Sequence, residues 1–317
     1  MSSSGGTQRG HGIILCALDA QADATPSYAD LLRISGFSVT VASGASKVLE
    51  AIHIEPPVCL VVPYSDAPDI AEKLLHELKS DHAYGHLPVV LLLSQAHAET
   101  MNWEDVAGDD YIVLPASSQE VSSRLRLCIE RSSRDLDANP LTGLPGNLTI
   151  MREAERHLAS GQPFALGYVD LDNFKPYNDK YGFSRGDEVL RMTARVVVNA
   201  VRSLRNPDTY VGHVGGDDFV FLAPSELAET AASAIVRDFD QVIPNFYDNE
   251  DRRAGMILSV DRQGVEKHFQ LIGCSIAIID TSISVVRHVG ELSARAAEVK
   301  KFAKATAGST YLIDRRR

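Results

Sequence analysis

The acidic residues best suited to chemistry lie at two places in the second half of the chain. Asp170 ends the apolar run 164–170, and a helix-like pattern begins a few residues later. Asp217 and Asp218 follow two glycines at the bend between two short apolar runs. Mg²⁺ prefers carboxylate and phosphate oxygens, and glycines allow a ligand to approach the backbone closely. If the bend lies beside Asp170, these residues form a cage for a divalent cation.

The backbone that follows Asp170 suits phosphate groups. A helix predicted near 173–181 begins directly after the carboxylates. Helix N-termini present free N–H groups and the positive end of the helix dipole, both of which favour phosphate oxygens. The sequence therefore predicts a metal–triphosphate site where this strand ends and this helix begins.

The elements that must position these residues form an α+β pattern. Strands are predicted at 164–170, 210–214, 219–223 and 269–279, and helices at 147–160, 173–181, 185–204, 225–240 and 289–305. The four residues 215–218 are read as the connection of a β-hairpin. The turn-rich stretch 139–146 separates this half from the first half of the chain.

The first half alternates aliphatic runs with amphipathic stretches. Strands are predicted at 13–18, 38–42, 58–62, 89–93 and 110–114, and helices at 27–35, 45–54, 69–79, 100–106 and 119–134. Apolar strands separated by helices indicate a parallel sheet covered on both faces, a doubly wound flavodoxin-like α/β fold. The expected divisions are a flexible tail at 1–11, a first domain at 12–133 and a second at 134–317.

Composition excludes several classes of protein. A formal net charge of −11 argues against a nucleic-acid surface. No apolar run is long enough to cross a bilayer, and the polar N-terminus lacks a signal-peptide core, so a cytoplasmic location without a membrane is expected. The cysteines lack zinc-ligand spacing and are expected to be small core residues: Cys16, Cys59, Cys128 and Cys274.

The second half resembles the GGDEF family over about 135–317. The resemblance rests on four motifs in order: Leu-Thr-Gly-Leu, Asp-x-Asp-x-Phe-Lys-x-x-Asn-Asp, Gly-Asp, and Gly-Gly-Asp-Asp-Phe. This family makes or senses cyclic di-GMP, which it forms from GTP. The resemblance implies a nucleotidyl-cyclase-like α+β fold, GTP as substrate, cyclic di-GMP as product, Mg²⁺ or Mn²⁺ as cofactor, and a homodimer in which each copy holds one GTP.

The resemblance also assigns the metal and the reaction to particular residues. The carboxylates of Asp170 and Asp217, with the carbonyl of Leu171, would hold the metal. The residues that would take part in the reaction are Asp170, Lys175, Asp217 and Asp218. One of the last two would lie near the attacking 3′-hydroxyl and help to remove its proton.

The substrate-binding residues implied by the resemblance form three groups. Backbone amides would cradle the terminal phosphates, and they belong to Asn173, Phe174 and Lys175. Asn178 and Asp187 would read the guanine edge, because adenine offers no matching donor pair to a carboxylate. Lys300 and Lys304 lie four residues apart on one helix face and would add positive charge near the phosphates, although an ordinary solvated face is the alternative.

Two of these motifs have ordinary structural alternatives. Ser184 and Asp187 could form a helix N-cap with its box acid. Arg205 and Asp208 resemble the family's Arg-x-x-Asp product-inhibition site, one residue further from the glycines than usual. The intervening Asn-Pro is also typical of a plain turn, so both interpretations stay open.

Three positions depart from the family pattern. Asp218 stands where active members usually carry Glu, His213 where Arg is usual, and Asn139 where Asp is usual. A displacement of about 1 Å in a catalytic site can cost on the order of 10²-fold in rate. The first hypothesis is a diguanylate cyclase, and the alternative is a weak or inactive GGDEF domain that acts as a receptor or scaffold for GTP or cyclic di-GMP. A cyclase of mixed adenine–guanine dinucleotides is disfavoured by Asp187.

The first half resembles a response-regulator receiver domain that has lost its reactive residues. Receivers place an acidic pair after the first strand, a phosphorylated Asp after the third, a hydroxyl after the fourth and a Lys after the fifth. Here the third strand ends in Pro63, Leu114 stands in the Lys position, Asp19 alone follows the first strand, and Ser94 lies near the hydroxyl position. We expect a domain that takes up no phosphate and serves as a dimerisation or docking module; the alternative is an unrelated flavodoxin-like domain.

Overall fold

The computed structural model describes residues 12–18, 25–81, 83–103, 105–260, 266–306 and 308–316. The expected tail at 1–11 and Asp19 lie outside the described residues. The chain divides into two compact units, residues 1–136 (unit 1) and 137–317 (unit 2). In the described parts of both units, no helix has the length and apolar character needed to cross a bilayer.

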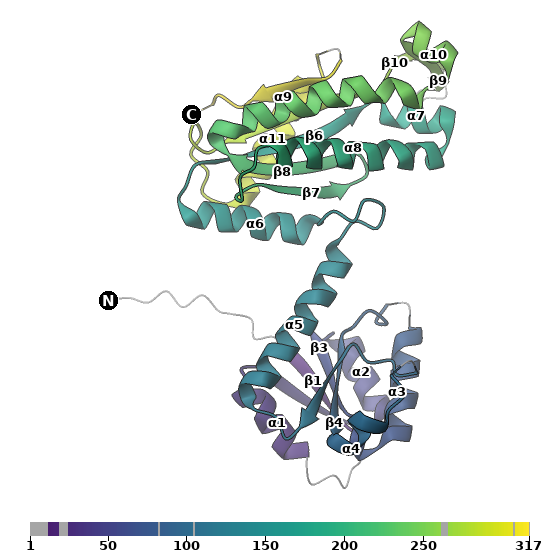
Figure 1. Ribbon diagram of the computed structural model, residues 1–317, viewed down its shortest axis with the longest axis vertical. Coiled ribbons are helices and arrows are strands. Elements are labelled where there is room, and N and C mark those ends of the chain that lie inside the picture. Colours follow the sequence, from purple (N-terminus) through teal and green to yellow (C-terminus); the bar gives the residue numbers. More distant parts are fainter. Residues whose placement is uncertain are drawn as a thin grey trace. The chain divides into compact units, whose positions relative to one another are not determined.

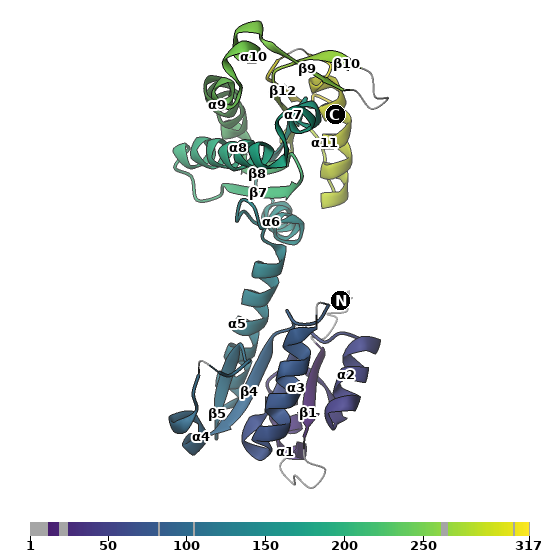
Figure 2. The ribbon, with the colours of Figure 1, turned by 90° about the vertical axis from the view of Figure 1, so that its right-hand side faces the viewer.

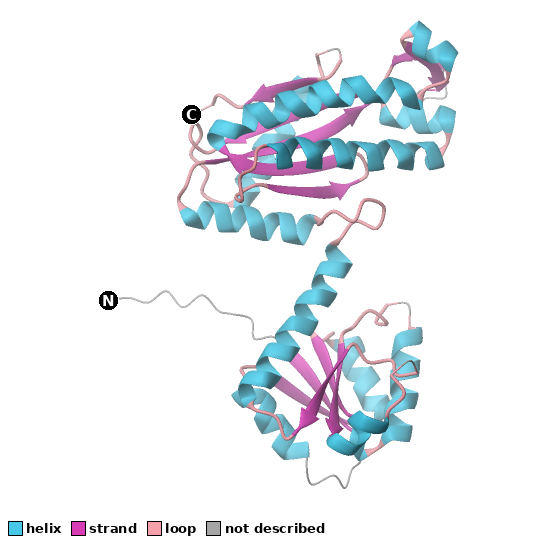
Figure 3. Ribbon diagram, viewed as in Figure 1, coloured by secondary structure: helices cyan, strands magenta, loops and turns pink. Residues whose placement is uncertain are grey.

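Unit 1 is a parallel five-stranded sheet with helices on both faces (Figures 1 and 3). Its strand order, β2-β1-β3-β4-β5, is that of flavodoxin-like doubly wound folds, so the predicted fold class is confirmed. Helices α2 and α3 pack on one face, and α1 and α5 on the other. The elements are β1 (Gly12–Ala17), α1 (Thr25–Ile34), β2 (Ser38–Ser43), α2 (Ala45–Ile54), β3 (Cys59–Pro63), η1 (Tyr64–Asp66), α3 (Pro68–Ser80), β4 (Val89–Ser94), α4 (Gln95–Thr100), β5 (Asp110–Leu114) and α5 (Ser118–Asp137).

The sequence patterns of unit 1 match its burial. Every residue of β3 is buried, as expected for a central strand covered on both faces. Helix α3 buries one apolar stripe, which consists of Ala71, Leu74, Leu75 and Leu78. The four cysteines of the chain are free and buried, as predicted.

One helix of unit 1 lies elsewhere than predicted. The expected helix at 100–106 is wrong: α4 begins at Gln95, directly after β4, and ends at Thr100. Ser94 is its N-cap, since the Ser94 Oγ accepts the N–H of His97 at 3.3 Å. A serine cap at the strand end satisfies a free N–H group of the first turn and so fixes the start of the helix there.

Unit 2 has a five-stranded sheet of order β12-β11-β6-β8-β7. Strand β12 is parallel to β11, and the other neighbours are antiparallel. Helices α8 and α9 cover one face, and α6 and α11 cover the other (Figure 2). The elements are α6 (Asn147–Ser160), β6 (Phe164–Asp172), α7 (Phe174–Tyr181), α8 (Phe183–Ser203), β7 (Tyr210–Gly215), β8 (Asp218–Pro224), α9 (Ser225–Val242), η2 (Ile243–Phe246), α10 (Asn249–Ala254), β9 (Met256–Val260), β10 (Glu266–Gln270), β11 (Gly273–Asp280), α11 (Val289–Ala303) and β12 (Thr310–Ile313).

Most elements of unit 2 lie where the sequence predicted them, and α6 agrees at both ends. The predicted strand at 269–279 is two strands, β10 and β11, because β10 pairs with β9 in a separate hairpin. This hairpin contacts α7, where the Ser259 hydroxyl donates to the Pro176 carbonyl at 3.0 Å. The sequence analysis missed β9, α10 and β12.

The hairpin of β7 and β8 turns more tightly than predicted. Its turn is the pair Gly216 and Asp217, not four residues, and the register shifts between His213 and Gly215. Gly216 has φ +59°, a conformation that glycine adopts without strain. A register shift of this kind changes the direction of the side chains that follow it.

The start of α6 is capped from outside the helix. Gly146 occupies the N-cap position, and a Cβ there would lie 2.1 Å from the carbonyl oxygen of Asp137. The Asp137 carboxylate accepts the N–H groups of Leu148 (2.8 Å) and Thr149 (2.9 Å). Asp137 is also the last residue of α5. One side chain therefore connects the end of α5 to the start of α6.

Candidate functional site

Three carboxylates converge where β6 lies beside the β7–β8 turn. Asp170 and Asp218 are directly opposite each other in the β6–β8 pairing, and Asp217 precedes Asp218 in the turn. Oxygen atoms from the three residues all lie within 4.8 Å of one another. Like charges placed opposite each other destabilise a sheet, so this arrangement needs positive charge nearby.

Asp170 is the most buried of the three, with 3% of its surface exposed. Burial is the main cause that raises the pKa of Asp170 to about 7; Asp218 raises it further, and Lys300 and Lys304 lower it. The lysines of the protein therefore compensate the buried charge only in part. Both oxygens of Asp170 are paired with lysine ammonium groups of α11. Hard carboxylate oxygens in this environment fit a divalent cation such as Mg²⁺.

Two lysines of α11 reach the carboxylates. The Lys300 Nζ lies 2.5 Å from the Asp218 Oδ1 and also pairs with Asp170. The Lys304 Nζ pairs with the other oxygen of Asp170 and lies 3.8 Å from Asp172. Burial lowers the pKa of Lys300, but its hydrogen bonds to Asp170 and Asp218 raise the pKa above its ordinary value.

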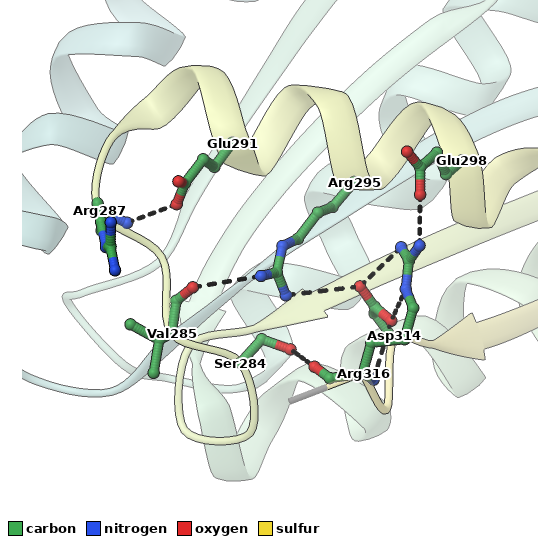
Figure 4. Close-up of polar contacts among 8 residues, drawn as sticks. All are labelled: Ser284, Val285, Arg287, Glu291, Arg295, Glu298, Asp314 and Arg316. Carbon is green, nitrogen blue, oxygen red and sulfur yellow. Dashed lines mark hydrogen bonds and ion pairs between the residues drawn. The ribbon is translucent and has the colours of Figure 1, made fainter.

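A polar network anchors α11 (Figure 4). The Arg295 Nη2 donates to the Val285 carbonyl at 3.3 Å, in the loop before the helix. Asp314, which follows β12 and is 3% exposed, accepts from the Arg316 Nε at 2.8 Å. Arg316 also pairs with a glutamate of α11. The network holds α11 in place against the sheet. It thereby determines where Lys300 and Lys304 lie relative to the carboxylates.

The predicted phosphate cradle lies at the start of α7. Asn173 is the N-cap in a left-handed conformation (φ +60°), which asparagine tolerates better than most residues. Phe174 is buried and anchors the helix, whereas Lys175 is exposed. A hollow of about 380 Å³ adjoins this helix start, and its lining includes Asp172, Asn173 and Lys304. That volume is in the range of small-molecule sites.

Asp172 is a residue that the sequence analysis left without a role. Its Oδ2 accepts the hydroxyl of Ser275 in the neighbouring strand β11 at 2.5 Å. Burial is the main cause that raises the pKa of Asp172, against the effects of Ser275 and Lys304. The spacing of Asp170 and Asp172 could have indicated that Asp172 lies at the site, because residues two apart on a strand point to the same face.

The predicted guanine-reading residues lie on two helices that touch. Asn178 belongs to α7 and Asp187 to α8, and a Cβ on Gly186 would lie 1.9 Å from the Asn178 Oδ1. Only glycine at 186 therefore permits this contact. Helix α8 begins at Phe183, with Gly182 as its N-cap, so the interpretation of Ser184 as the cap is wrong.

His213 links the turn that opens unit 2 to the β7–β8 hairpin. It is 2% exposed and stacks on Phe219, with ring centroids 4.1 Å apart. Its Nε2 lies 3.0 Å from the Gly216 carbonyl, and its Nδ1 lies 3.0 Å from the Thr142 Oγ1. Since a carbonyl only accepts, we assign the proton to Nε2, so that Nδ1 accepts from Thr142. Burial lowers the pKa of His213, which favours this neutral form.

The opening turn itself is held by Asn139. The Asn139 Oδ1 accepts the N–H groups of Leu141 (3.0 Å) and Thr142 (3.2 Å). The two departures at Asn139 and His213 thus lie at one junction, where neutral hydrogen bonds connect the turn to the hairpin.

The predicted product-inhibition residues lie after the end of α8. Arg205 is exposed and has a left-handed backbone (φ +49°). Asp208 is exposed and lies 3.8 Å from Arg156 of α6. Neither residue contributes to the carboxylate group around Asp170.

The strand ends of unit 1 hold a different set of groups. β3 ends at Pro63 and β5 at Leu114, as the sequence indicated. The Ser65 Oγ accepts the N–H of Ser94 at 2.8 Å and lies 2.8 Å from the His97 Nδ1. Within the described ranges, the group of three carboxylates able to hold a metal is in unit 2.

Comparison with known proteins finds a similarity that lies mainly in the second unit. The family model "Diguanylate cyclase, GGDEF domain" matches residues 112–259. The matched stretch includes Asp170, Asp187 and Asp217 and stops before α11, which carries Lys300 and Lys304.

Two curated relatives illustrate the similarity in sequence. The chain is 29% identical over 170 residues to the diguanylate cyclase DgcM of Escherichia coli (strain K12), which covers 50% of this chain and 40% of DgcM. It is 27% identical over 165 residues to the response regulator PleD of Caulobacter vibrioides (strain NA1000 / CB15N), covering 46% of this chain and 36% of PleD. The aligned part is thus less than half the length of either relative.

Two solved structures are similar to the chain at lower identity. The GGDEF domain of DgcB from Caulobacter crescentus, in complex with c-di-GMP, is 19% identical with a TM-score of 0.42, covering 57% of this chain and 96% of that one. The diguanylate cyclase SiaD from Pseudomonas aeruginosa, in complex with its activator SiaC, is 18% identical with a TM-score of 0.41, covering 92% of each chain.

Proposed function

We propose that this chain, whose residues 112–259 match the GGDEF domain of diguanylate cyclases, condenses two molecules of GTP into cyclic di-GMP. Two copies of unit 2 face each other, and each holds one GTP. The 3′-hydroxyl of each GTP attacks the α-phosphate of the other, so that two P–O bonds form and two pyrophosphates leave. One copy alone cannot close the ring, so the reaction requires a dimer.

The convergence of three carboxylates beside a helix N-terminus is the observation that supports this proposal most directly. Asp170, Asp217 and the Leu171 carbonyl hold a divalent cation, which neutralises charge on the phosphates when it is bound. Backbone amides at the start of α7 and the ammonium groups of α11 bind the triphosphate. Positioning and charge neutralisation are the main contributions of a protein to phosphoryl-type transfer.

Guanine specificity is assigned to the contact between α7 and α8. Asn178 and Asp187 bond to the base edge, and Gly186 lets the Asn178 side chain lie against the start of α8. A carboxylate accepts from the N1–H and the amino group of guanine, and it is left unpaired when adenine enters the site. An unpaired polar group in a closed site gives strong discrimination.

Asp218 and His213 determine how well the site is aligned for the reaction. Asp218, or Asp217 beside it, takes the proton of the attacking hydroxyl, and Lys175 adds positive charge at the phosphates. Asp218 is one methylene shorter than the usual Glu, and it accepts a hydrogen bond from the Lys300 Nζ at 2.5 Å. His213 holds the turn that carries Asp217 through the Gly216 carbonyl.

Regulation and assembly extend the same proposal. Unit 1 brings two copies together and takes up no phosphate, because Pro63 occupies the end of β3. Arg205 and Asp208 bind the cyclic product on the surface of unit 2, where an exposed guanidinium can form a paired contact with a phosphate.

The direct test is incubation of the purified chain with GTP and Mg²⁺, followed by chromatography for a cyclic dinucleotide. The expected result is cyclic di-GMP and pyrophosphate with GTP, no product with ATP, and no product after chelation of the metal. Tight binding of cyclic di-GMP without any turnover would contradict the cyclase proposal and identify a receptor. In that case, loss of binding in Arg205→Ala would locate the receptor site.

A further inference from the structure

The place of the proposed metal is taken by two ammonium groups. Both oxygens of Asp170 are in ion pairs, Oδ2 with the Lys300 Nζ and Oδ1 with the Lys304 Nζ. Lys300 also bonds to Asp218 at 2.5 Å, so it bridges two of the three carboxylates. Only 4% of the Asp170 side chain is exposed, which leaves little surface for a further ligand.

A divalent cation and these lysines compete for the same oxygens. Like charges a few ångströms apart in a partly buried site repel strongly, because water and salt screen them less there than at the surface, and the repulsion is larger for a divalent ion. A cation that binds Asp170 must therefore displace Lys300, Lys304 or both from the carboxylate. A displaced ammonium group in a partly buried site needs another anion, because an unpaired buried charge is costly.

A hollow that shares Asp172 and Lys304 with the site is suited to that anion. The lining of the hollow of about 380 Å³ includes both Lys304 and Asn173, the N-cap of α7. A triphosphate at this helix N-terminus places several negative charges within reach of the C-terminal turn of α11. An ammonium group that leaves Asp170 can then pair with phosphate oxygens.

We propose that Lys300 and Lys304 are built-in counter-cations that exclude a free divalent cation and move to the phosphates when metal and nucleotide arrive together. This proposal rests on the function proposed above and adds an order of binding to it. The metal enters as its nucleotide complex, and the carboxylates remain neutralised when nucleotide is absent. Each lysine thus has opposite effects on the two ligands: it opposes metal alone and supports metal with triphosphate.

The first test measures Mn²⁺ alone, without nucleotide, by equilibrium binding with detection of free Mn²⁺ by electron paramagnetic resonance. Lys300→Met keeps the aliphatic stem and removes the charge, and it is expected to bind Mn²⁺ at least about 10-fold more tightly than the wild type, a change of about 1.4 kcal/mol. Lys304→Met is expected to shift in the same direction. Lys301→Met is the matched control, because Lys301 is exposed on the same helix, and its affinity should equal that of the wild type.

The second test measures binding of a non-hydrolysable GTP analogue at saturating Mn²⁺. Lys300→Met is expected to bind the analogue at least about 10-fold more weakly, opposite in sign to its effect on Mn²⁺ alone. Lys300→Arg keeps the charge and is expected to keep free Mn²⁺ out. Should Lys300→Met fail to fold, as shown by its melting curve, Lys304→Met and Lys300→Arg carry the test.

The proposal is overturned if neither methionine variant binds free Mn²⁺ more tightly than the wild type does. It is also overturned if metal and analogue affinities change in the same direction. These outcomes are distinct from failure of the proposed function. A chain that makes cyclic di-GMP but shows equal Mn²⁺ affinities refutes only the lysine exchange, whereas a chain that makes no product but shows the Mn²⁺ effect refutes only the cyclase.

Discussion

The two units differ in what they place at the ends of their central strands. In unit 1, Ser65, Ser94 and His97 bond to one another beside Pro63, and each finds its partner within the fold. In unit 2, β6 and β8 set Asp170 opposite Asp218, and burial raises the pKa of Asp170 to about 7. Folding alone does not favour two carboxylates in such a position. The comparison indicates that the carboxylates of unit 2 need positive charge beside them, whereas the polar groups at these strand ends of unit 1 satisfy one another.

The largest expected effect comes from removing one charge from the carboxylate group. Asp217→Asn keeps the shape of the side chain in the β7–β8 turn and removes a proposed metal ligand. We expect formation of cyclic di-GMP to fall by at least about 10²-fold, since electrostatic groups of this kind contribute that much to catalysis. The assay is product formation from GTP, with the melting temperature as a check on folding. Asp238→Asn, on the partly exposed face of α9, is the control. Unchanged turnover in Asp217→Asn would contradict the proposal that the carboxylates of unit 2 take part in the reaction.

The next effect concerns the contact between α7 and α8. In Gly186→Ala the new Cβ would lie 1.9 Å from the Asn178 Oδ1, so the amide side chain must move. A displacement of about 1 Å in a binding site can cost on the order of 10²-fold, and we expect kcat/KM for GTP to fall by about that factor. Gly12→Ala in unit 1 is the matched control, because a Cβ there meets no atom within 4 Å. Equal losses in both variants would show that the effect is not specific to the guanine site.

A smaller effect concerns stability and its dependence on pH. Because burial lowers the pKa of His213, the unfolded chain binds a proton just below the ordinary histidine value of about 6.5 that the folded domain does not bind. Stability from this residue is therefore fully present above about pH 6.5 and is lost as the pH falls through the folded pKa. Denaturant unfolding of the wild type and of His213→Gln should show the variant gaining relative stability as the pH falls.

A second variant of His213 and a contradicting outcome complete the pH test. His213→Phe leaves the Gly216 carbonyl without its donor and is expected to cost about 1–3 kcal/mol at neutral pH. A difference between the wild type and His213→Gln that stays constant from pH 7.5 to 5.5 would show that protonation of His213 is not coupled to folding.

For unit 1 we expect no effect: acetyl phosphate should not phosphorylate it. Incubation with acetyl phosphate and Mg²⁺ is expected to add no phosphoryl group, because a phosphoaspartate cannot form at Pro63. Intact mass measured after the incubation checks this result. A receiver domain that carries the usual Asp is the positive control. A stoichiometric gain of one phosphoryl group within residues 1–136 would contradict the prediction that unit 1 accepts no phosphate.

Much of the architecture could be predicted from the sequence because local patterns determine it. The apolar strands of unit 1 and the ends of α6 follow from hydrophobic period and turn residues. The same patterns misplaced α4, whose start depends on a single hydrogen bond to Ser94. They also missed β9 and β12, since short strands at a sheet edge or in a separate hairpin carry little periodic signal.

The sequence allowed a prediction of which residues belong to the candidate site. It did not allow a prediction of which of these residues contact one another or which other residues they contact. Asp170, Asp217 and Asp218 were identified from motif order, and the structure places them together. The pairing of Lys300 with Asp170 joins residues 130 positions apart in the chain, and no local pattern encodes that contact. The bond from Thr142 to His213 is similar, because it depends on how the opening turn folds against β7.

Asp137 gives the chain a mechanical property. The same residue terminates α5 and holds the first turn of α6 through two backbone N–H groups. The Pro145 carbonyl accepts the N–H of His213, so a short series of hydrogen bonds leads from Asp137 to the strand that enters the Gly216 turn. If these hydrogen bonds couple the two ends energetically, the coupling free energy is the same in both directions. A change in the Gly216 turn is therefore coupled, through the same hydrogen bonds, to the last residue of α5.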